Sequence, residues 1–146
     1  MTDSEEISRL IYRYGYLLDQ ADFEGIGDLL AHATFGSDRL GRAAIRGRQE
    51  IVDQFRRTSI PEGTEKTKQI YSNLLVDVDG DHASSLCNFV VFQATEKLPL
   101  QPIVCGRFED SFERDAGGWR FADRYIVVDL MGDLSERLYE GTQPYS

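Results

Sequence analysis

The sequence is poor in several residue types, and each scarcity excludes a class of site. Its 146 residues include two cysteines, Cys87 and Cys105, and neither lies in a CxxC pair, so a cysteine-ligated metal site is excluded. The two histidines lack the HExxH spacing of a helical zinc site, and no glycine-rich phosphate loop follows a strand-like run. We therefore expect neither a metal nor any other cofactor.

Long apolar runs and basic clusters are also scarce. No run approaches the ~18 apolar residues that a membrane span requires, and the acidic N-terminus is unlike a signal peptide, so we expect a cytoplasmic protein. Asp and Glu number 25 against 16 Lys and Arg, which gives a formal net charge of -9. We expect no nucleic acid and no membrane as partner, because both attract clustered cations.

The remaining composition is that of an ordinary globular protein, with 41% hydrophobic and 28% charged residues. A chain of this length corresponds to one domain. We predict a single domain over 1–146, in which 131–146 form a polar tail where Leu134 and Leu138 fit one helical turn. A chain of this size buries roughly 68–70% of its unfolded surface, which is enough for one core and one pocket.

Apolar residues recur at helical spacing in the first part of the chain. They predict a helix over 4–19, and Thr2 or Asp3 fits its N-cap because each has a Glu three residues on. Asp22 fits the N-cap of a second, short helix. A third helix is predicted to begin near Ile51, and it runs to about Thr58. These segments give about three N-terminal helices.

The chain after residue 65 is strand-like. Four strands joined by tight turns are predicted over 67–78, 82–94, 103–114 and 119–130. The stretch 33–46 is ambiguous, and Phe35 is its only hint of a short strand. Helices followed by long antiparallel strands indicate an α+β fold. Because strands twist, we expect a curved antiparallel sheet that wraps around the helices as a cone with an internal pocket.

Several stretches also match a known family. They are Leu18-Asp19-Gln20-Ala21-Asp22-Phe23, Ile45-Arg46-Gly47-Arg48, Asn73 with Val76-Asp77-Val78-Asp79-Gly80-Asp81-His82-Ala83, Gly106-Arg107-Phe108-Glu109-Asp110, and Trp119-Arg120-Phe121 with Gly132-Asp133-Leu134-Ser135. With them the chain resembles the nuclear transport factor two-like superfamily. Within it, the chain resembles the SnoaL-like branch that includes scytalone dehydratase, the bile-acid dehydratases and a dehydrochlorinase of chlorinated cyclohexanes. The resemblance covers nearly the whole chain and implies a cone-shaped α+β barrel.

The resemblance also suggests a catalytic pair. In catalytic members, an Asp near the end of the first helix and a His on a sheet strand form a proton-shuttling dyad. The Asp matches Asp19 here, whereas the His position matches Gln69, whose amide does not titrate near neutrality. The spacing of Tyr14 and Asp19 resembles the tyrosine–aspartate pair of the bile-acid dehydratases.

The residues themselves leave these roles open. Asp19 flanks the apolar stripe of its helix, as either a pocket carboxylate or a solvated residue. Tyr14 lies on that stripe, as either a core residue or a hydrogen-bond donor to substrate. Gln69, Tyr71 and Asn73 alternate along one strand and should share a face, which lines the pocket or meets solvent.

Two further pairs of residues are less informative. One of Arg107 and Arg124 should be exposed, and the pattern does not say which. His82 should lie exposed at a hairpin end, and nothing fixes His32 in a pocket.

Two functions are therefore compatible with these residues. One is a cofactor-independent lyase or isomerase, in which Asp19 moves a proton, Tyr14 stabilises an oxyanion, and Gln69 with Asn73 holds the substrate. Its ligand would be a small apolar ring compound such as a polyketide, a steroid or an aromatic catabolite. The alternative is a non-catalytic ligand-binding or accessory subunit, which Gln69 favours.

A third function is open on the resemblance alone. The small β subunit of a ring-hydroxylating dioxygenase shares the implied fold. Members of this fold usually associate through the outer face of the sheet, and the apolar alternation of 86–92 and 121–128 leaves surface for it. We therefore expect a homodimer or homotrimer.

Overall fold

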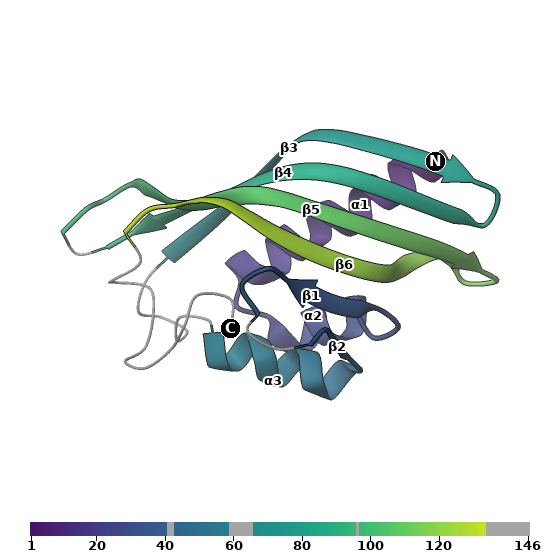
Figure 1. Ribbon diagram of the computed structural model, residues 1–146, viewed down its shortest axis with the longest axis horizontal. Helices are drawn as coiled ribbons and strands as arrows, with labels where there is room; N and C mark the ends of the chain where they lie inside the picture. The colour runs from purple at the N-terminus through teal and green to yellow at the C-terminus, as the bar shows by residue number, and fades with distance from the viewer. Residues whose placement is uncertain (41–42, 59–65, 96, 134–146) are drawn as a thin grey trace.

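The computed structural model describes residues 1–40, 43–58, 66–95 and 97–133, so the predicted helical turn at Leu134 and Leu138 lies outside the described residues. Within these ranges the chain forms three helices and one curved, unclosed six-stranded sheet (Figure 1). The predicted α+β class is confirmed. No helix in this part of the chain is both long enough and apolar enough to cross a membrane.

The helices are α1 (Asp3–Asp19), α2 (Phe23–Leu29) and α3 (Arg48–Thr58). Thr2 caps α1 in a capping box with Glu5, because each residue bonds the other's backbone N–H. The Asp22 side chain accepts a hydrogen bond from the Gly25 N–H and so caps α2. The predicted helices and the cap at Asp22 are confirmed, and the capping box selects Thr2 of the two candidates for α1.

The strands are β1 (Thr34–Ser37), β2 (Ile45–Arg46), β3 (Lys66–Asp79), β4 (His82–Ala94), β5 (Gln101–Asp115) and β6 (Gly118–Met131). Their order in the sheet is β2-β1-β6-β5-β4-β3. The four long strands are antiparallel as predicted, and β1 confirms the hint at Phe35. Strand β1 pairs with β6 in parallel, and β2 was not predicted.

Alternation along β4 defines the inner face of the sheet. The inward residues are Ala83, Ser85, Cys87, Phe89, Val91 and Gln93, which are all buried. Helix α1 packs on this face, since Ile7, Ile11 and Tyr14 join Cys87 and Phe89 in one core cluster. In Figure 1, α1 runs behind the long strands, while α2 and α3 lie together on the side of β1 and β2.

A β-bulge in β3 overturns one prediction. The register with β4 shifts between Ser72 and Leu75, and Asn73 adopts a positive φ of 55° there. Asn73 is exposed, whereas Leu74 and Val76 pack against the core. The prediction that Asn73 shares a face with Gln69 and Tyr71 is therefore wrong, because the extra residue resets the alternation.

Candidate functional site

Aromatic side chains fill the middle of the interior, between α1 and the inner face. The Tyr14 ring contacts Phe108 edge-on with centroids 5.7 Å apart, and Tyr71 contacts the same ring at 4.9 Å. Phe89 stacks on Phe108 at 4.7 Å. Two of the predicted site residues, Tyr14 and Tyr71, therefore meet around one phenylalanine.

Among these rings lies a buried ion pair. The Nε and Nη2 atoms of Arg124 donate to the two carboxylate oxygens of Asp110 at 2.9 and 2.8 Å, and both side chains have an exposed fraction of 0%. The guanidinium also lies 3.9 Å from the centre of the Phe108 ring and 4.2 Å from that of Tyr14. The third nitrogen, Nη1, is buried and has no hydrogen-bond partner among the described residues.

The charges of this pair stabilise each other. Burial alone would lower the pKa of the Arg124 guanidinium, but the Asp110 carboxylate raises it, and both tyrosines at 14 and 71 add to the effect. Burial raises the pKa of the Asp110 carboxyl, and Arg124 lowers it in part. Arg124 therefore remains a cation inside the protein, and its Nη1 atom has no hydrogen-bond partner among the described residues.

The structure shows which of the two arginines, Arg107 and Arg124, is buried. Arg124 is the buried one, whereas Arg107 is partly exposed and pairs with Asp129 at 2.6 Å. Sequence reasoning missed Asp110 as a site residue. The signal was its place between Phe108 and Phe112, where strict alternation puts a carboxylate on an apolar inner face.

Asp19 lies at the C-terminal end of α1, where the helix meets β3. Its Oδ1 accepts a hydrogen bond from the backbone N–H of Gln69 at 3.0 Å. Partial burial raises the pKa of the Asp19 carboxyl, while the Gln69 N–H and the charge of Lys68 lower it in part. Desolvation prevails, so this carboxyl holds its proton more tightly than an exposed one.

Gln69 connects Asp19 to the aromatic interior. The Tyr71 hydroxyl donates to the Gln69 Oε1 at 3.1 Å, while the Gln69 backbone holds Asp19. The Tyr71 ring lies against Gly15, where a Cβ would come within 2.9 Å of the ring. Gly15 thus allows the close approach of α1 to Tyr71.

The structure therefore brings four of the five predicted site residues together: Asp19, Tyr14, Gln69 and Tyr71. Asn73 lies apart from them at the bulge. Both histidines, His32 and His82, are exposed. Across the described ranges, no three His, Cys, Asp or Glu side chains gather where they could hold a metal ion.

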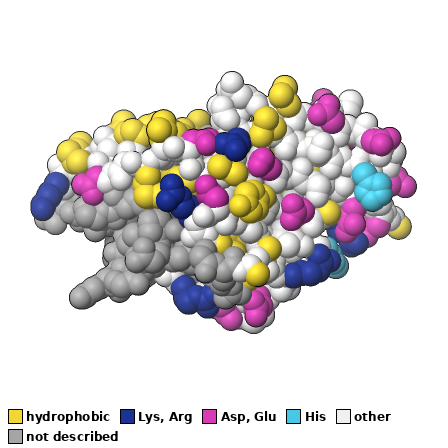
Figure 2. Space-filling model, in the orientation of Figure 1, with side chains coloured by type: hydrophobic (Ala, Val, Ile, Leu, Met, Phe, Trp, Pro, Cys, Tyr) yellow, Lys and Arg dark blue, Asp and Glu magenta, His cyan; other side chains and the backbone are white. Residues whose placement is uncertain are grey.

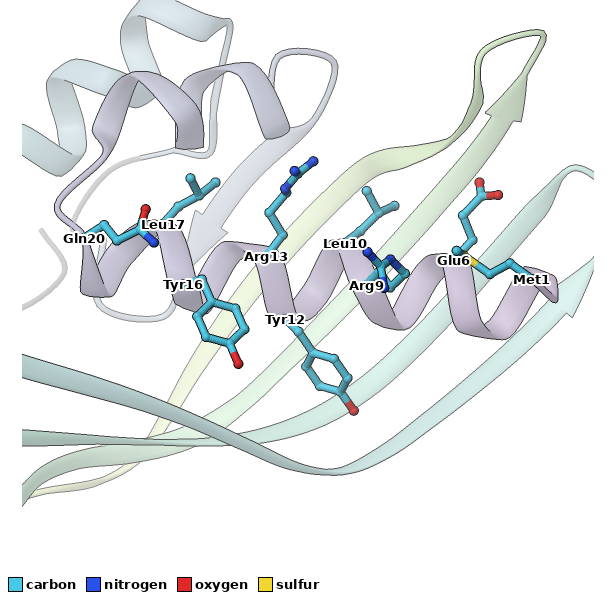
Figure 3. A pocket seen from close by; sticks show the side chains of 9 residues that line it. All are labelled: Met1, Glu6, Arg9, Leu10, Tyr12, Arg13, Tyr16, Leu17 and Gln20. Atoms are coloured by element: carbon cyan, nitrogen blue, oxygen red, sulfur yellow. The ribbon is translucent and has the colours of Figure 1, made fainter.

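A separate groove of about 700 Å³ lies along the outward face of α1 (Figure 3). Its lining residues are Met1, Glu6, Arg9, Leu10, Tyr12, Arg13, Tyr16, Leu17 and Gln20. Tyr12 and Tyr16 have exposed fractions of 42% and 65%, in contrast to the buried Tyr14. None of the predicted site residues lines this groove, so we place the candidate site in the interior.

Comparison with known structures supports this fold. An NTF2-like protein with a cystatin-like fold from Novosphingobium aromaticivorans is 27% identical, with a TM-score of 0.73 over 86% of this chain and 81% of that one. A variant of Rv3472, a protein of unknown function from Mycobacterium tuberculosis, is 26% identical, with a TM-score of 0.70 over 86% and 70% of the two chains. A scytalone dehydratase-like protein from Novosphingobium aromaticivorans is 20% identical, with a TM-score of 0.68 over 87% and 84%.

The family itself is shown by sequence. No curated protein matches this chain. Residues 1–125 match the family described as the SnoaL-like domain, and this range contains Asp19, Gln69, Asp110 and Arg124. The chain therefore belongs to the SnoaL-like family of the NTF2-like superfamily.

Proposed function

We propose that this protein takes a small, mostly apolar ring compound into its interior and acts on it as a cofactor-independent lyase or isomerase. One observation carries the proposal. A desolvated carboxyl, Asp19, is linked through Gln69 and Tyr71 to the same aromatic interior that holds Arg124 with an unused N–H. A base and an oxyanion donor are the two groups that proton abstraction next to a carbonyl requires.

The chemistry follows from these two groups. Asp19, once ionised, takes a proton from the carbon beside a substrate carbonyl, and the electron pair moves onto the carbonyl oxygen. Arg124 Nη1 and the Tyr14 hydroxyl stabilise that oxyanion, and a low-dielectric site strengthens their effect. Collapse of the enolate then breaks the bond to a hydroxyl group on the next carbon, which leaves as water with the proton that Asp19 took, so that the Asp19 carboxylate is restored. In an isomerisation, Asp19 instead returns this proton to another carbon of the enolate. The raised pKa of Asp19 makes its carboxylate a stronger base than a solvated one.

The aromatic residues of the interior favour one class of substrate. Phe89, Phe108, Tyr14 and Tyr71 offer aromatic surface, which suits a polyketide, a steroid or an aromatic catabolite. Gln69 and Tyr71 would hold a polar substituent of the ring. Asn73 has no part in this proposal because it is exposed at the bulge.

A second candidate function is a ligand-binding or accessory subunit without catalysis. The observation that favours it is Gln69 itself, since an amide at this position accepts from Tyr71 but cannot shuttle a proton. The two functions share one interior site and differ only in whether turnover occurs.

Substitution of Asp19 distinguishes the two. Asp19→Asn is nearly isosteric, and Asp77→Asn, at an exposed position of β3, is the matched control. Hydroxylated ring ketones are incubated with each variant, and loss of water or isomerisation is followed by mass spectrometry and NMR. The enzyme proposal predicts turnover that only Asp19→Asn abolishes. Binding without turnover in the wild type supports the accessory subunit instead.

We also propose that the protein forms a homodimer or homotrimer through the outer face of the sheet. Leu75 and Leu86 are directly opposite each other on β3 and β4, with exposed fractions of 63% and 42%. Hydrophobic side chains are visible along the sheet in Figure 2, interspersed with charged ones. An exposed apolar patch of this kind is typical of a contact surface.

A further inference from the structure

Gln93, on the inner face of β4, is a buried polar residue that neither the fold nor the proposed chemistry uses. Its side chain is 1% exposed, and neither Oε1 nor Nε2 has a hydrogen-bond partner among the described residues. Buried polar groups are nearly always paired, because an unpaired one costs the protein its hydration without compensation. An amide with both ends unpaired therefore points to a ligand that pairs them.

Cross-strand register locates Gln93 relative to the candidate site. It is directly opposite Thr67 on β3 and Gln101 on β5, and opposite residues in a sheet share a face. The next row along the same two strands contains Gln69 and Val91. Gln93 is thus a diagonal neighbour of Gln69, the residue that holds Asp19.

The residues around Gln93 define the charge of the group it can take. Thr67, Gln101 and Gln69 are all uncharged, and the backbone N–H of Gln69 donates to the Asp19 carboxyl. Lys68, the basic residue between Thr67 and Gln69, is exposed and opposite Phe92. An anionic substituent would find no cation on this row of the inner face, so an uncharged one fits.

We propose that Gln93 is a specificity-determining residue, which selects ligands that carry an uncharged hydrogen-bond donor beside an acceptor. A carboxamide, or a hydroxyl next to a carbonyl, has this pattern and matches Nε2 and Oε1 of the amide. The inference rests on the proposed function in one respect, that an apolar ring compound enters the interior. Beyond the proposed function, the inference specifies the substituent of the ring compound that faces Gln93 on β4.

A panel of three naphthalenes that differ in one substituent tests the proposal. Naphthalene-2-carboxamide offers a donor and an acceptor, 2-acetylnaphthalene offers an acceptor only, and 2-naphthoate is an anion. Binding is measured by calorimetry at about pH 8 to the full-length protein. We expect the carboxamide to bind at least about tenfold more tightly than the other two, because they leave part of the buried amide unpaired.

Substitutions of Gln93 provide the second arm. Gln93→Met keeps the volume and removes both polar ends, so the preference for the carboxamide should vanish. The melting temperature of the ligand-free variant should rise, because an unpaired buried amide is gone. Gln93→Glu keeps an acceptor and, when ionised, cannot donate, so it should also lose the preference. Asn88→Met, at an exposed position on the outer face of β4, is the matched control and should keep it.

The outcomes separate this inference from the proposed function. Equal binding of all three naphthalenes by the wild type would overturn the role of Gln93 while leaving an interior site for ring compounds. A Gln93→Met variant that melts at a lower temperature and keeps the preference would mean that the amide is structural, and would also overturn it. If none of the three binds, the proposed function fails, and this inference fails with it.

Discussion

The guanidinium of Arg124 and the carboxylate of Asp110 face each other across β5 and β6 with two parallel hydrogen bonds and no exposed side-chain surface. Each charge is removed from water and is balanced by the other. Such a pair contributes little compared with apolar residues of the same volume, but the loss of one member leaves the other charge uncompensated. The pair therefore makes the interior sensitive to single substitutions.

This asymmetry gives the first prediction. Arg124→Met should lower the free energy of unfolding by about 3–5 kcal/mol, because Asp110 is left buried without its partner. The double variant Arg124→Met with Asp110→Leu should be more stable than Arg124→Met alone. Urea denaturation of the single and double variants measures both values.

The exposed ion pair on the same two strands is the control. Arg107 pairs with Asp129, and their side chains are 38% and 47% exposed. Arg107→Met should cost only about 0–1 kcal/mol, as exposed pairs do. If Arg124→Met is no more destabilising than Arg107→Met, the prediction of a costly uncompensated charge at Asp110 is wrong.

The second prediction concerns the pH dependence of stability at Asp19. Its raised pKa means that the folded protein binds this proton more tightly than the unfolded chain does. The favourable contribution is present at low pH and is lost as pH rises from the unfolded pKa, about 3.9, through the raised folded pKa. Asp19→Asn cannot ionise, so this variant should gain stability relative to wild type as pH rises from about 4 to about 7.

Urea denaturation across this pH range measures the free energy of unfolding of Asp19→Asn and of the wild type. Because the two proteins are compared by how this free energy changes with pH, any constant effect of the substitution on the Gln69 hydrogen bond cancels. Asp77→Asn, at an exposed position, is measured in parallel. A stability difference between Asp19→Asn and wild type that stays constant with pH would contradict a desolvated carboxyl at this position.

The elements that were predicted correctly are those determined by residues close together in the sequence. Helical spacing and the Thr2 capping box define α1, and alternation with tight turns defines the four long strands, so neither depends on distant contacts. Strand β2 has two residues, Ile45 and Arg46, which carry too little pattern to be recognised. The bulge at Asn73 shifts the alternation by one residue, and nothing in the sequence of β3 marks it.

The candidate site was predictable only in part, for a related reason. Tyr14 and Asp19 follow from helix geometry together with the family resemblance. Asp110 did not stand out, and Arg124 could not be distinguished from Arg107, because a charged residue in a strand is usually exposed and its burial depends on a partner from another strand. Gln93 was missed likewise, since its isolation becomes evident only when the surrounding residues are placed.

The third prediction tests the outer face of the sheet. Leu86→Lys places a charge beside Leu75, on the proposed contact surface, and should shift a dimer or trimer toward monomer. Light scattering at micromolar concentration measures the mass of both proteins. Gln49→Lys, at an exposed position of α3 and therefore away from the outer face of the sheet, is the matched control. A wild-type protein of monomer mass would contradict the proposed association.

The last prediction returns to the residue that departs from the family dyad. Gln69 holds Asp19 through its backbone N–H, which a substitution at this position keeps, and its side chain already accepts from Tyr71. Gln69→His would therefore introduce a group that titrates near neutrality beside an intact Asp19. If the interior is a dehydratase-like site, the rate of dehydration should rise, since general acid–base groups contribute about 10²- to 10⁴-fold.

The pH profile identifies the new group. The gain from Gln69→His should depend on a pKa near that of histidine, about 6.5, and should disappear when Asp19→Asn is added. Lys68→His, at the neighbouring exposed position of β3, should give no gain, because residue 68 is opposite Phe92 and lies outside the inner face. A folded Gln69→His variant that binds ring compounds as the wild type does, yet shows no added turnover, would favour the accessory subunit over the enzyme.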